Sequence, residues 1–357
     1  MRQKSKAWGF WAFSALLAAL IFTLNCWQSA RAQMDDAADL STQQEQEKGE
    51  LRNMKKEIDD IKSNMQNALQ DMSRVQQVAS GENIKEFHLQ AKESNWEVFP
   101  GCNVNACTYN NQTPGPTIRV SEGDQVKIVL HNALKTTTSL YIQGLAVPHR
   151  VDGLPRKGAG LINPGEAYVY QFIASQPGTY YYRPQVPHLD QMHRGMVGVI
   201  VVEPKSIPKT YERDQIVVLT EAENADINKK AANGQRQTVT GNLFLANGKS
   251  AQALPPLELK QGERMRLRVV NASAQPCPFS LTGHRMEIVS QNGSDGVEPH
   301  IMRDTITIHP GERMDLEFSA DNPGVWSLSS LSANQCSFNG QFPGGFAMVV
   351  RYPEAMK

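Results

Sequence analysis

The chain has 357 residues, of which 40% are hydrophobic and 20% charged, which is enough for two ordinary globular domains and a further segment and excludes a wholly disordered protein. Lys plus Arg and Asp plus Glu both number 36, so the formal net charge is zero. Without a positive net charge, a basic run or basic residues interleaved with aromatic ones, the sequence argues against nucleic-acid binding.

The first 32 residues have the pattern of a secretory signal peptide. A basic start, MRQKSK, precedes an apolar segment from Ala7 to about Trp27, and Ala30-Arg31-Ala32 forms a small-x-small cleavage signal. The alternative is an uncleaved membrane anchor, because about 20 apolar residues suffice to cross a bilayer. Either way, the sequence predicts an exported protein of the periplasm or cell envelope.

A helical segment is expected next, after a flexible polar stretch at 33–50. From position 51 the apolar residues recur at alternating spacings of three and four: Leu51, Met54, Ile58, Ile61, Met65, Ala68, Met72, Val75 and Ala79. This stripe predicts a parallel coiled coil at 51–80 that joins copies of the chain. The alternative is a helix that lies on the protein's own domains, although so narrow a stripe suits a partner helix better.

From Phe87 to the end the apolar pattern has period two, which predicts an all-β region. The region also repeats internally. EGDQVKIVLHNA from Glu122 matches QGERMRLRVVNA from Gln261, and Pro164-Gly165-Glu166 matches Pro310-Gly311-Glu312. Two copies predict two β-sandwiches, at 86–204 and 211–353, joined near 204–210.

The stretch GTYYYRPQVPHLDQMHRGMVG, Gly178 to Gly198, carries a family resemblance. Together with TPGPTIRVSEGD, DGLP and INPGEAYVYQF, it resembles the N-terminal cupredoxin domain of multicopper oxidases, which include laccases and copper nitrite reductases. The resemblance covers roughly residues 86–353. It implies an all-β fold of two cupredoxin-like Greek-key β-sandwiches in tandem.

The same resemblance places other residues where the family has copper ligands. In the first copy, LYIQG occupies the place of the family's HWHG, so Tyr141 and Gln143 replace two histidines. YYRPQ occupies the place of the two histidines in GTYWYHSH, so Arg183 and Gln185 replace two more. In the second copy the replacements are Cys277, Ser280 and Thr282, followed by Ser329, Ser330, Leu331 and Gln335. A guanidinium has no lone pair for a metal, and copper prefers imidazole and sulfur. The resemblance therefore implies no complete copper set, and we expect no cofactor and assign no catalytic, cofactor-binding or metal residue.

Three histidines remain for an unconventional site: His149, His188 and His193. His188 and His193, with Met192 and Met196, have the composition of a soft Cu(I) site. The alternative is a solvated loop whose Met side chains pack under the sandwich. The histidines in framework strings, His88, His131, His284 and His309, are expected to be structural, and His300 is uninformative.

The cysteines beyond Cys26 are expected to pair in an oxidising compartment. Cys102 and Cys107 lie in what reads as a short polar loop, so a local disulfide is expected between them. The resemblance places Cys277 and Cys336 on neighbouring loops at the mononuclear copper position, which implies a second disulfide. The alternatives for Cys277 and Cys336 are a soft metal site with a nearby Met, or two unpaired thiols.

The function expected from these observations is that of an exported, multicopper oxidase-like protein that has lost its copper sites. It would act as a binding or scaffolding protein in the cell envelope rather than as an enzyme. The alternative is a copper-binding oxidoreductase with an unconventional copper site. Two-domain members of the family form head-to-tail trimers, so the expected partners are other copies of this chain, in a homotrimer, and an unidentified envelope protein.

Overall fold

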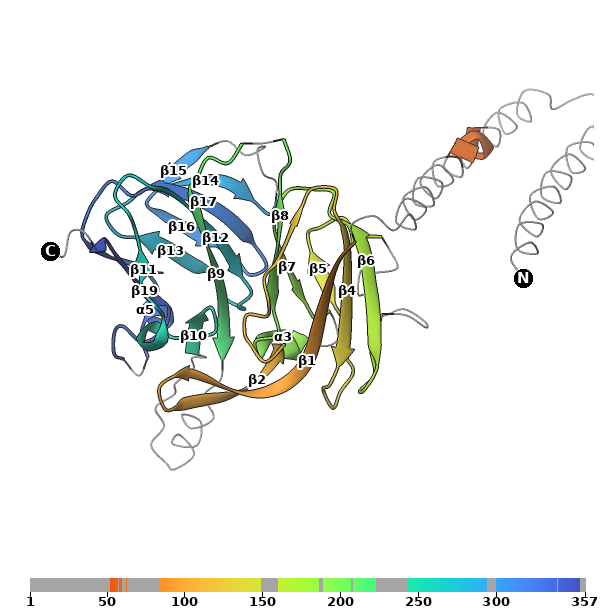
Figure 1. Ribbon diagram of the computed structural model, residues 1–357, viewed down its shortest axis with the longest axis horizontal. Helices are drawn as coiled ribbons and strands as arrows, with labels where there is room; N and C mark the ends of the chain where they lie inside the picture. Colours follow the sequence, from red (N-terminus) through yellow and green to blue (C-terminus); the bar gives the residue numbers. More distant parts are fainter. Residues whose placement is uncertain are drawn as a thin grey trace, which may run out of the picture. The chain divides into compact units, whose positions relative to one another are not determined.

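A computed structural model of the protein describes residues 52–56, 58–59, 62, 84–148, 160–185, 189–206, 208–222, 243–293, 300–338 and 340–353. Residues 52–56, 58–59 and 62 are α-helical, but most of the predicted coiled coil lies outside the described residues, as do the expected signal peptide and the 33–50 segment. None of the helices within these ranges has the length and apolar character needed to cross a membrane. From Ile84 onward the described chain is built mainly of β-strands (Figure 1).

The first sandwich consists of two four-stranded sheets, in the orders β2-β1-β4-β6 and β3-β8-β7-β5. Its strands are β1 (Ile84–Phe99), β2 (Cys102–Tyr109), β3 (Ile118–Ser121), β4 (Gln125–Asn132), β5 (Tyr141–Gln143), β6 (Ala167–Ile173), β7 (Gly178–Arg183) and β8 (Gly198–Glu203). A short helix, α3 (Leu189–His193), lies between β7 and β8, where the sequence predicted only a loop.

The second sandwich pairs a six-stranded sheet, β10-β9-β12-β17-β14-β15, with a five-stranded sheet, β11-β19-β18-β13-β16. The elements are β9 (Arg213–Ala222), β10 (Leu243–Ala246), η2 (Ala251–Ala253), β11 (Leu257–Glu258), β12 (Arg264–Asn271), β13 (Cys277–Leu281), β14 (Met286–Gln291), β15 (Ile301–Arg303), β16 (Thr305–Ile308), β17 (Arg313–Ser319), β18 (Val325–Ser330), α5 (Ala333–Cys336) and β19 (Ala347–Arg351).

The internal repeat is reproduced in the hydrogen bonds of both sandwiches. Strands β1 and β4 pair in parallel, and so do β9 and β12 at the corresponding place in the second copy. The Gly165 N–H donates to the Asn132 carbonyl at 2.8 Å, and the Gly311 N–H donates to the Asn271 carbonyl at the same distance. The predicted tandem of two cupredoxin-like sandwiches is confirmed, while the boundaries 86–204 and 211–353 stay a prediction.

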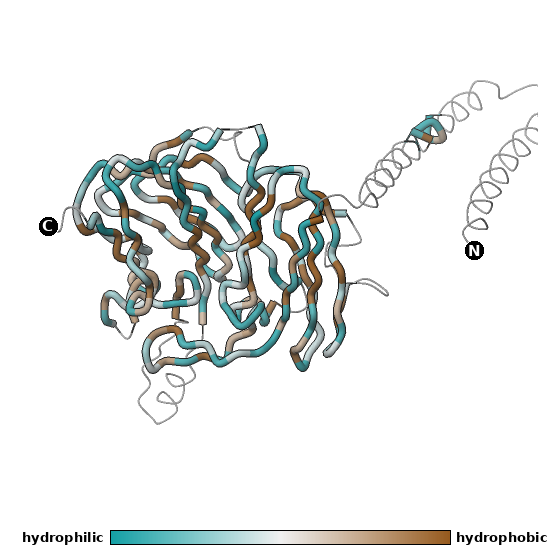
Figure 2. The backbone as a smooth tube through the Cα atoms, in the orientation of Figure 1, coloured by the Kyte–Doolittle hydropathy of each residue, from teal (hydrophilic) through white to brown (hydrophobic). Residues whose placement is uncertain are grey.

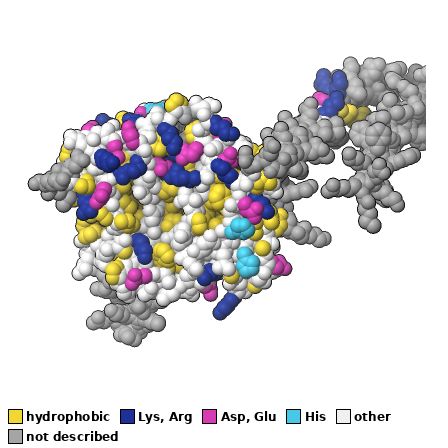
Figure 3. All heavy atoms as spheres, viewed as in Figure 1, with side chains coloured by type: hydrophobic (Ala, Val, Ile, Leu, Met, Phe, Trp, Pro, Cys, Tyr) yellow, Lys and Arg dark blue, Asp and Glu magenta, His cyan; other side chains and the backbone are white. Residues whose placement is uncertain are grey.

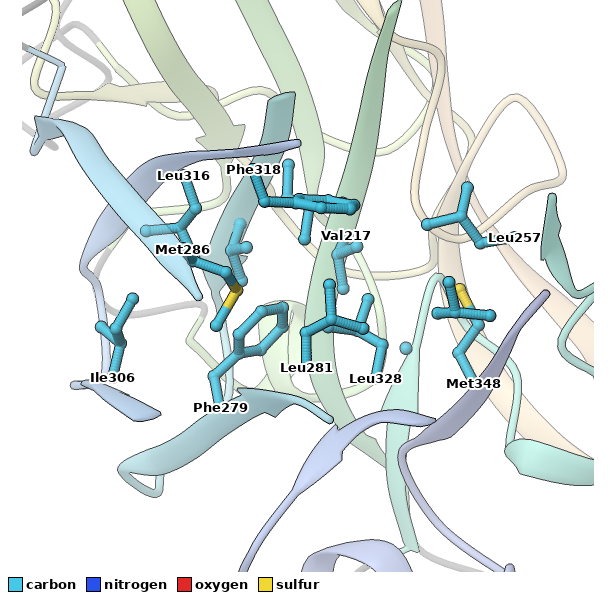
Figure 4. Close-up of a cluster of buried hydrophobic side chains, with 14 of the residues drawn as sticks. Val217, Leu257, Phe279, Leu281, Met286, Ile306, Leu316, Phe318, Leu328 and Met348 are labelled. Atoms are coloured by element: carbon cyan, nitrogen blue, oxygen red, sulfur yellow. The ribbon is translucent and has the colours of Figure 1, made fainter. Parts of the chain in front are cut away.

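The alternation predicted for β12 also holds. Met265, Leu267 and Val269 point into the core of the second sandwich. In Figure 4, Phe279 and Leu281 of β13 face Val217 of β9 and Phe318 of β17 across that core, so the two sheets close on each other through large apolar side chains. Figure 2 shows the corresponding hydrophobic segments along the central strands. Each fully buried side chain of this size stabilises the fold by about 1.5–3 kcal/mol.

The outward-facing arginines of β12 form ion pairs, and one of them, Arg268, is buried where the first sandwich meets the second. Arg268, whose side chain is 1% exposed, donates to Asp315 at 2.8 Å and to Asp214 at 2.6 Å. It also donates to the Thr179 hydroxyl of β7 at 2.9 Å. We call Arg268, Asp214 and Asp315 the interface network, since these ion pairs lie where the two sandwiches meet. Basic and acidic side chains are likewise interleaved on the face that Figure 3 shows.

Tyr181 of β7 is buried although it does not belong to the core of the first sandwich. It is only 2% exposed. It packs with Val199 and Val201 of the first sandwich against Val218 and Val270 of the second. The outer face of β7 is therefore an internal surface between the sandwiches.

The expected Cys102–Cys107 disulfide is wrong, because the structure has no disulfide bond between these two residues. The expected polar loop is the strand β2, and the two residues stand five positions apart on it. At about 3.3 Å per residue they are roughly 16 Å apart, and their side chains point to opposite faces. A disulfide needs Cα atoms within about 7 Å, which β2 does not allow.

Candidate functional site

Two antiparallel strands bring together the first-copy positions of the family's copper ligands. Tyr141 of β5 pairs with Arg183 of β7, and Gln143 pairs with Tyr181. The Arg183 guanidinium lies over the Tyr141 ring, 5.0 Å from its centroid. Its Nη2 donates to Gln143 Oε1 at 3.1 Å, and its Nη1 donates to the Pro184 carbonyl at 2.9 Å. The sequence-based grouping of these positions is thus confirmed in space.

Gln185 completes this cluster, with its side-chain oxygen 3.4 Å from Arg183 Nη1 and its backbone N–H donating to the Ser139 hydroxyl at 3.1 Å. The cluster therefore presents a guanidinium, two amides and a phenol. These groups do not fit copper, which takes imidazole and sulfur donors, and a fixed cation opposes a metal ion by charge.

Arg313 of β17 reaches the same place and was missed by the sequence reasoning. Arg313 is only 3% exposed. Its Nε donates to the Thr179 carbonyl at 3.0 Å, and its Nη2 donates to the Asn292 carbonyl. A Cβ on Gly144 would collide with Arg313 Nη2, so the guanidinium passes directly against the residue that follows Gln143. Burial lowers the pKa of Arg313 from its usual value.

Tyr181 lies within the field of both arginines. Burial raises the pKa of its phenol, and the positive charges of Arg183 and Arg313 oppose that rise. Deprotonation of Tyr181 is therefore suppressed, and the phenol keeps its proton as a hydrogen-bond donor at neutral pH.

In the second copy, only some of the residues that replace the family's copper ligands lie close together. The Ser330 hydroxyl donates to Gln335 Oε1 at 2.6 Å, and Gln335 Nε2 donates to the Pro276 carbonyl at 2.9 Å. Cys277 is in hydrogen-bond contact with Ser330, and burial raises the pKa of its thiol to about 12. Cys277, Ser330 and Gln335 thus form a neutral and buried cluster.

The other second-copy positions point away from that cluster. Ser280 donates to the Asp304 carbonyl at 3.1 Å, and Thr282 is bonded to the backbone of Ser327. Ser329 lies opposite Ser280 in the β13–β18 register, and Leu331 is 58% exposed.

The expected Cys277–Cys336 disulfide is also wrong, because both thiols are free. Cys277 points into the core of the second sandwich. On α5 it is Gln335, the neighbour of Cys336, that turns toward Ser330 and the strand ends. Successive helical residues point about 100° apart, which directs Cys336 elsewhere, and its Sγ lies 3.8 Å from the Ala333 carbonyl.

The histidines expected for an unconventional site are only partly described. His149 and His188 lie outside the described residues, whereas His193 is exposed at the end of α3 and Met192 is half-buried. Met196 is fully buried in the core of the first sandwich, which removes it from a set with the exposed His193. The structural role predicted for His284 is confirmed, since its ring is buried and bonds Thr282 O and Tyr352 Oη.

Within the described ranges, no group of three or more His, Cys, Asp or Glu side chains is arranged to hold a metal ion. The short helices α3 and α5 each carry a buried glutamine that bonds neighbouring loops, Gln191 in α3 and Gln335 in α5. Gln191 accepts from Thr138 at 2.6 Å and donates to the Thr137 carbonyl at 2.8 Å, as Gln335 does with Ser330 and Pro276 in the second copy. Each sandwich therefore ties its loops with a buried glutamine that the sequence reasoning did not identify in the first copy.

Comparison with known proteins gives the family of these two sandwiches. Multicopper oxidase domain models match residues 90–207 and 214–346. The chain is 28% identical to the multicopper oxidase MmcO of Mycobacterium tuberculosis, over 64% of this chain and 50% of the relative. It is 27% identical to a copper resistance protein A homolog of Pseudomonas syringae pv. tomato, over 71% and 50% of the two chains.

Among solved structures, a blue copper oxidase from Nitrosomonas europaea superposes with a TM-score of 0.68 at 27% identity, covering 76% of this chain and 87% of that chain. The chain spans about half the length of the curated relatives named above. These copper proteins correct the expectation that no cofactor is bound. That expectation is wrong, because the family matches point to copper even though the residues at the first-copy positions do not fit it. With both sandwiches matched and the fold shared, the chain belongs to the multicopper oxidase family.

Proposed function

We propose that the protein is an exported copper-binding oxidoreductase of the multicopper oxidase family, with copper held away from the inherited ligand positions. The observation that carries this proposal is the match of both sandwiches to multicopper oxidase domains. Relatives named for copper resistance and for blue copper oxidase support the metal. The residues proposed to hold it are histidines outside the Arg183 cluster, namely His149, His188 and His193.

The chemistry of these residues supports that choice. Neutral imidazole is a good ligand for copper, and a thioether such as that of Met192 suits Cu(I). His193 is exposed on α3 and Met192 is half-buried beside it, so both can reach a solvent-borne ion. Bound copper would supply one-electron redox chemistry.

Metal analysis tests the proposal directly. Purified full-length protein is loaded with copper, freed of excess metal and analysed for bound copper, by absorption spectroscopy and by oxidase assay. Stoichiometric copper is expected, and it should fall when His149, His188 and His193 are replaced by Ala together. The matched control is His131→Ala, which removes an exposed framework histidine and should leave the copper content unchanged. Copper at wild-type level in the triple variant, or none in the wild type, would refute the proposal.

A binding or scaffolding role in the cell envelope is the second candidate function. The Arg183 cluster favours it, because a guanidinium held by Gln143 and Pro184 occupies positions that carry oxidase ligands in the family. A protein of this kind would show no oxidase turnover after copper loading. It would instead be recovered with the same partner from native envelope extracts when Arg183 is intact.

Export and self-association belong to the same proposal. The 1–32 segment supports passage into the periplasm or envelope, and the 51–79 stripe supports a parallel homo-oligomer, with three chains as the family precedent. Deletion of residues 33–80 should reduce the mass found by light scattering to that of a smaller assembly. An unchanged mass would mean that the stripe does not drive assembly.

A further inference from the structure

We propose that Arg183 and Arg313 form a binding site for a small oxyanion, such as a carboxylate or phosphate group, at the end of β5. The two arginines come from different sandwiches, Arg183 from β7 and Arg313 from β17. Gln143 accepts from Arg183, and the next residue, Gly144, lies against Arg313. The two guanidinium groups therefore reach adjacent residues of the chain.

Neither arginine donates a hydrogen bond to a carboxylate. Within the described ranges, the bonds of Arg183 go to Gln143, Pro184, Gln185 and the Tyr181 phenol, and those of Arg313 go to the Thr179 and Asn292 carbonyls. Asp315, two residues beyond Arg313, attracts it electrostatically but is hydrogen-bonded to Arg268 at 2.8 Å. A carboxylate shared in this way leaves positive charge that an anion can neutralise.

Both side chains also keep hydrogen-bond donors in reserve. Arg183 Nε is buried and bonds no acceptor within the described residues. Arg313 donates these two bonds from Nε and Nη2, so within the described residues its Nη1 can still donate to a ligand. The Tyr181 phenol, held protonated, adds a third donor beside them. A site with spare donors on two guanidinium groups selects for an acceptor that is negatively charged.

The donor type sets the class of ligand. A planar guanidinium matches two oxygens of a carboxylate or phosphate group through parallel N–H···O bonds. Tyr141 and Gln143 are half-buried rather than buried, so this edge of the cluster is in contact with solvent. The outer faces of β7 and β17 meet close by through Thr179 and Asp315, which limits the ligand to a small group.

Isothermal titration of the full-length protein with inorganic phosphate and, separately, with acetate tests the proposal at constant ionic strength. One saturable site is expected, and the probe that binds more tightly shows whether a tetrahedral or planar ion is preferred. Arg183→Gln keeps a hydrogen-bonding side chain but removes the charge, and should weaken binding by about tenfold or more. The control is Arg194→Gln, which removes an exposed arginine paired with Glu93 at 2.9 Å and should bind as the wild type does.

A second variant and a structure keep the test decisive. Arg313→Lys retains the charge but loses the planar guanidinium that can donate two parallel hydrogen bonds, and it should also weaken binding. If this variant does not fold, the result for Arg183→Gln decides the test. Crystals soaked in selenate should show the ion between the two guanidinium groups. Absence of saturable binding, equal affinity in Arg183→Gln, or a carboxylate from a second copy seated between the arginines would overturn the proposal.

Discussion

Two regions of this protein bury arginine, and they do so in opposite ways. In the interface network, Arg268 is enclosed by Asp214 and Asp315, and Tyr211 and Thr179 accept its remaining donors. In the Arg183 cluster, the guanidinium contacts amide and carbonyl oxygens and an aromatic ring, with Arg313 close by. The arginine of the first region is paired with carboxylates, and that of the second is not.

The difference separates structural arginines from those available to a ligand. A buried cation with matched carboxylates contributes to the union of the sandwiches, and removing one partner leaves the others uncompensated. A cation that is not paired with a carboxylate contributes little to the stability of the fold. Its charge can still attract an anionic ligand to the folded protein. The comparison therefore predicts opposite effects on stability and on binding for the two regions.

Substitution in the interface network should have the largest effect. Arg268→Met removes the cation that bonds buried Asp315 at 2.8 Å and leaves it only Arg266 at 3.6 Å, while Asp214 keeps Arg119. We expect a loss of about 3–5 kcal/mol in the free energy of unfolding. Urea unfolding followed by far-ultraviolet circular dichroism measures it. The exposed Arg194→Met variant is the control, and a loss below about 1 kcal/mol for Arg268→Met would remove the distinction between the two regions.

The interface network should also make stability fall in acid. Burial raises the pKa of Asp214, but hydrogen bonds from Arg268 and Arg119 outweigh it and lower the pKa below 3.8. Glu317 lies next to the network, since Arg266 pairs with both Glu317 and Asp315. Hydrogen bonds from Arg264, Thr210 and Arg266 outweigh its burial and lower its pKa below 4.5. A depressed carboxyl pKa means that the folded protein binds the proton more weakly than the unfolded chain does.

The stabilisation from these carboxylates is therefore complete above about pH 4.5 and is lost as the pH falls through the lowered pKa values. Urea midpoints measured from pH 7 to pH 3 should drop at the acid end, and Asp214→Asn should flatten that drop. Equal midpoints at pH 5 and pH 3 in the wild type would contradict the role given to the network.

The fold was predictable from the sequence because its determinants are local. Period-two alternation in β12, the Pro-Gly-Glu turns and the internal repeat all depend on neighbouring residues. The meeting of Tyr141, Gln143, Arg183 and Gln185 also followed, because the resemblance fixed their places on two paired strands. The approach of Arg313 did not follow, since it depends on how one sandwich docks on the other. The disulfides failed for a related reason: β2 was taken for a loop, and Cys336 for a residue facing the strand ends.

Gly144→Ala should have an intermediate effect, on both stability and oxyanion binding. Gly144 has a φ of +85°, and a Cβ there would collide with the Arg313 guanidinium. We expect a loss of about 1–3 kcal/mol from the unfavourable backbone and the displaced arginine. Urea unfolding gives the loss, and phosphate titration shows whether displacing Arg313 also weakens binding. Gly165→Ala, with a φ of +83° and open space around it, is the matched control for the backbone part alone.

The smallest effect on stability is expected from Arg183→Met, and it is the sharpest test of the comparison. The variant loses hydrogen bonds to Gln143 and Pro184, worth about 0.5–1.5 kcal/mol each, but Gln143 is half-buried and can bond water instead. We expect the free energy of unfolding to stay within about 1 kcal/mol of the wild type, measured by urea unfolding without added oxyanion. With phosphate present, the wild type should gain stability and the variant should gain less, because only the wild type keeps both guanidinium groups. A loss as large as that of Arg268→Met would show that Arg183 stabilises the fold through a partner within the protein. The distinction between the two regions would then be wrong.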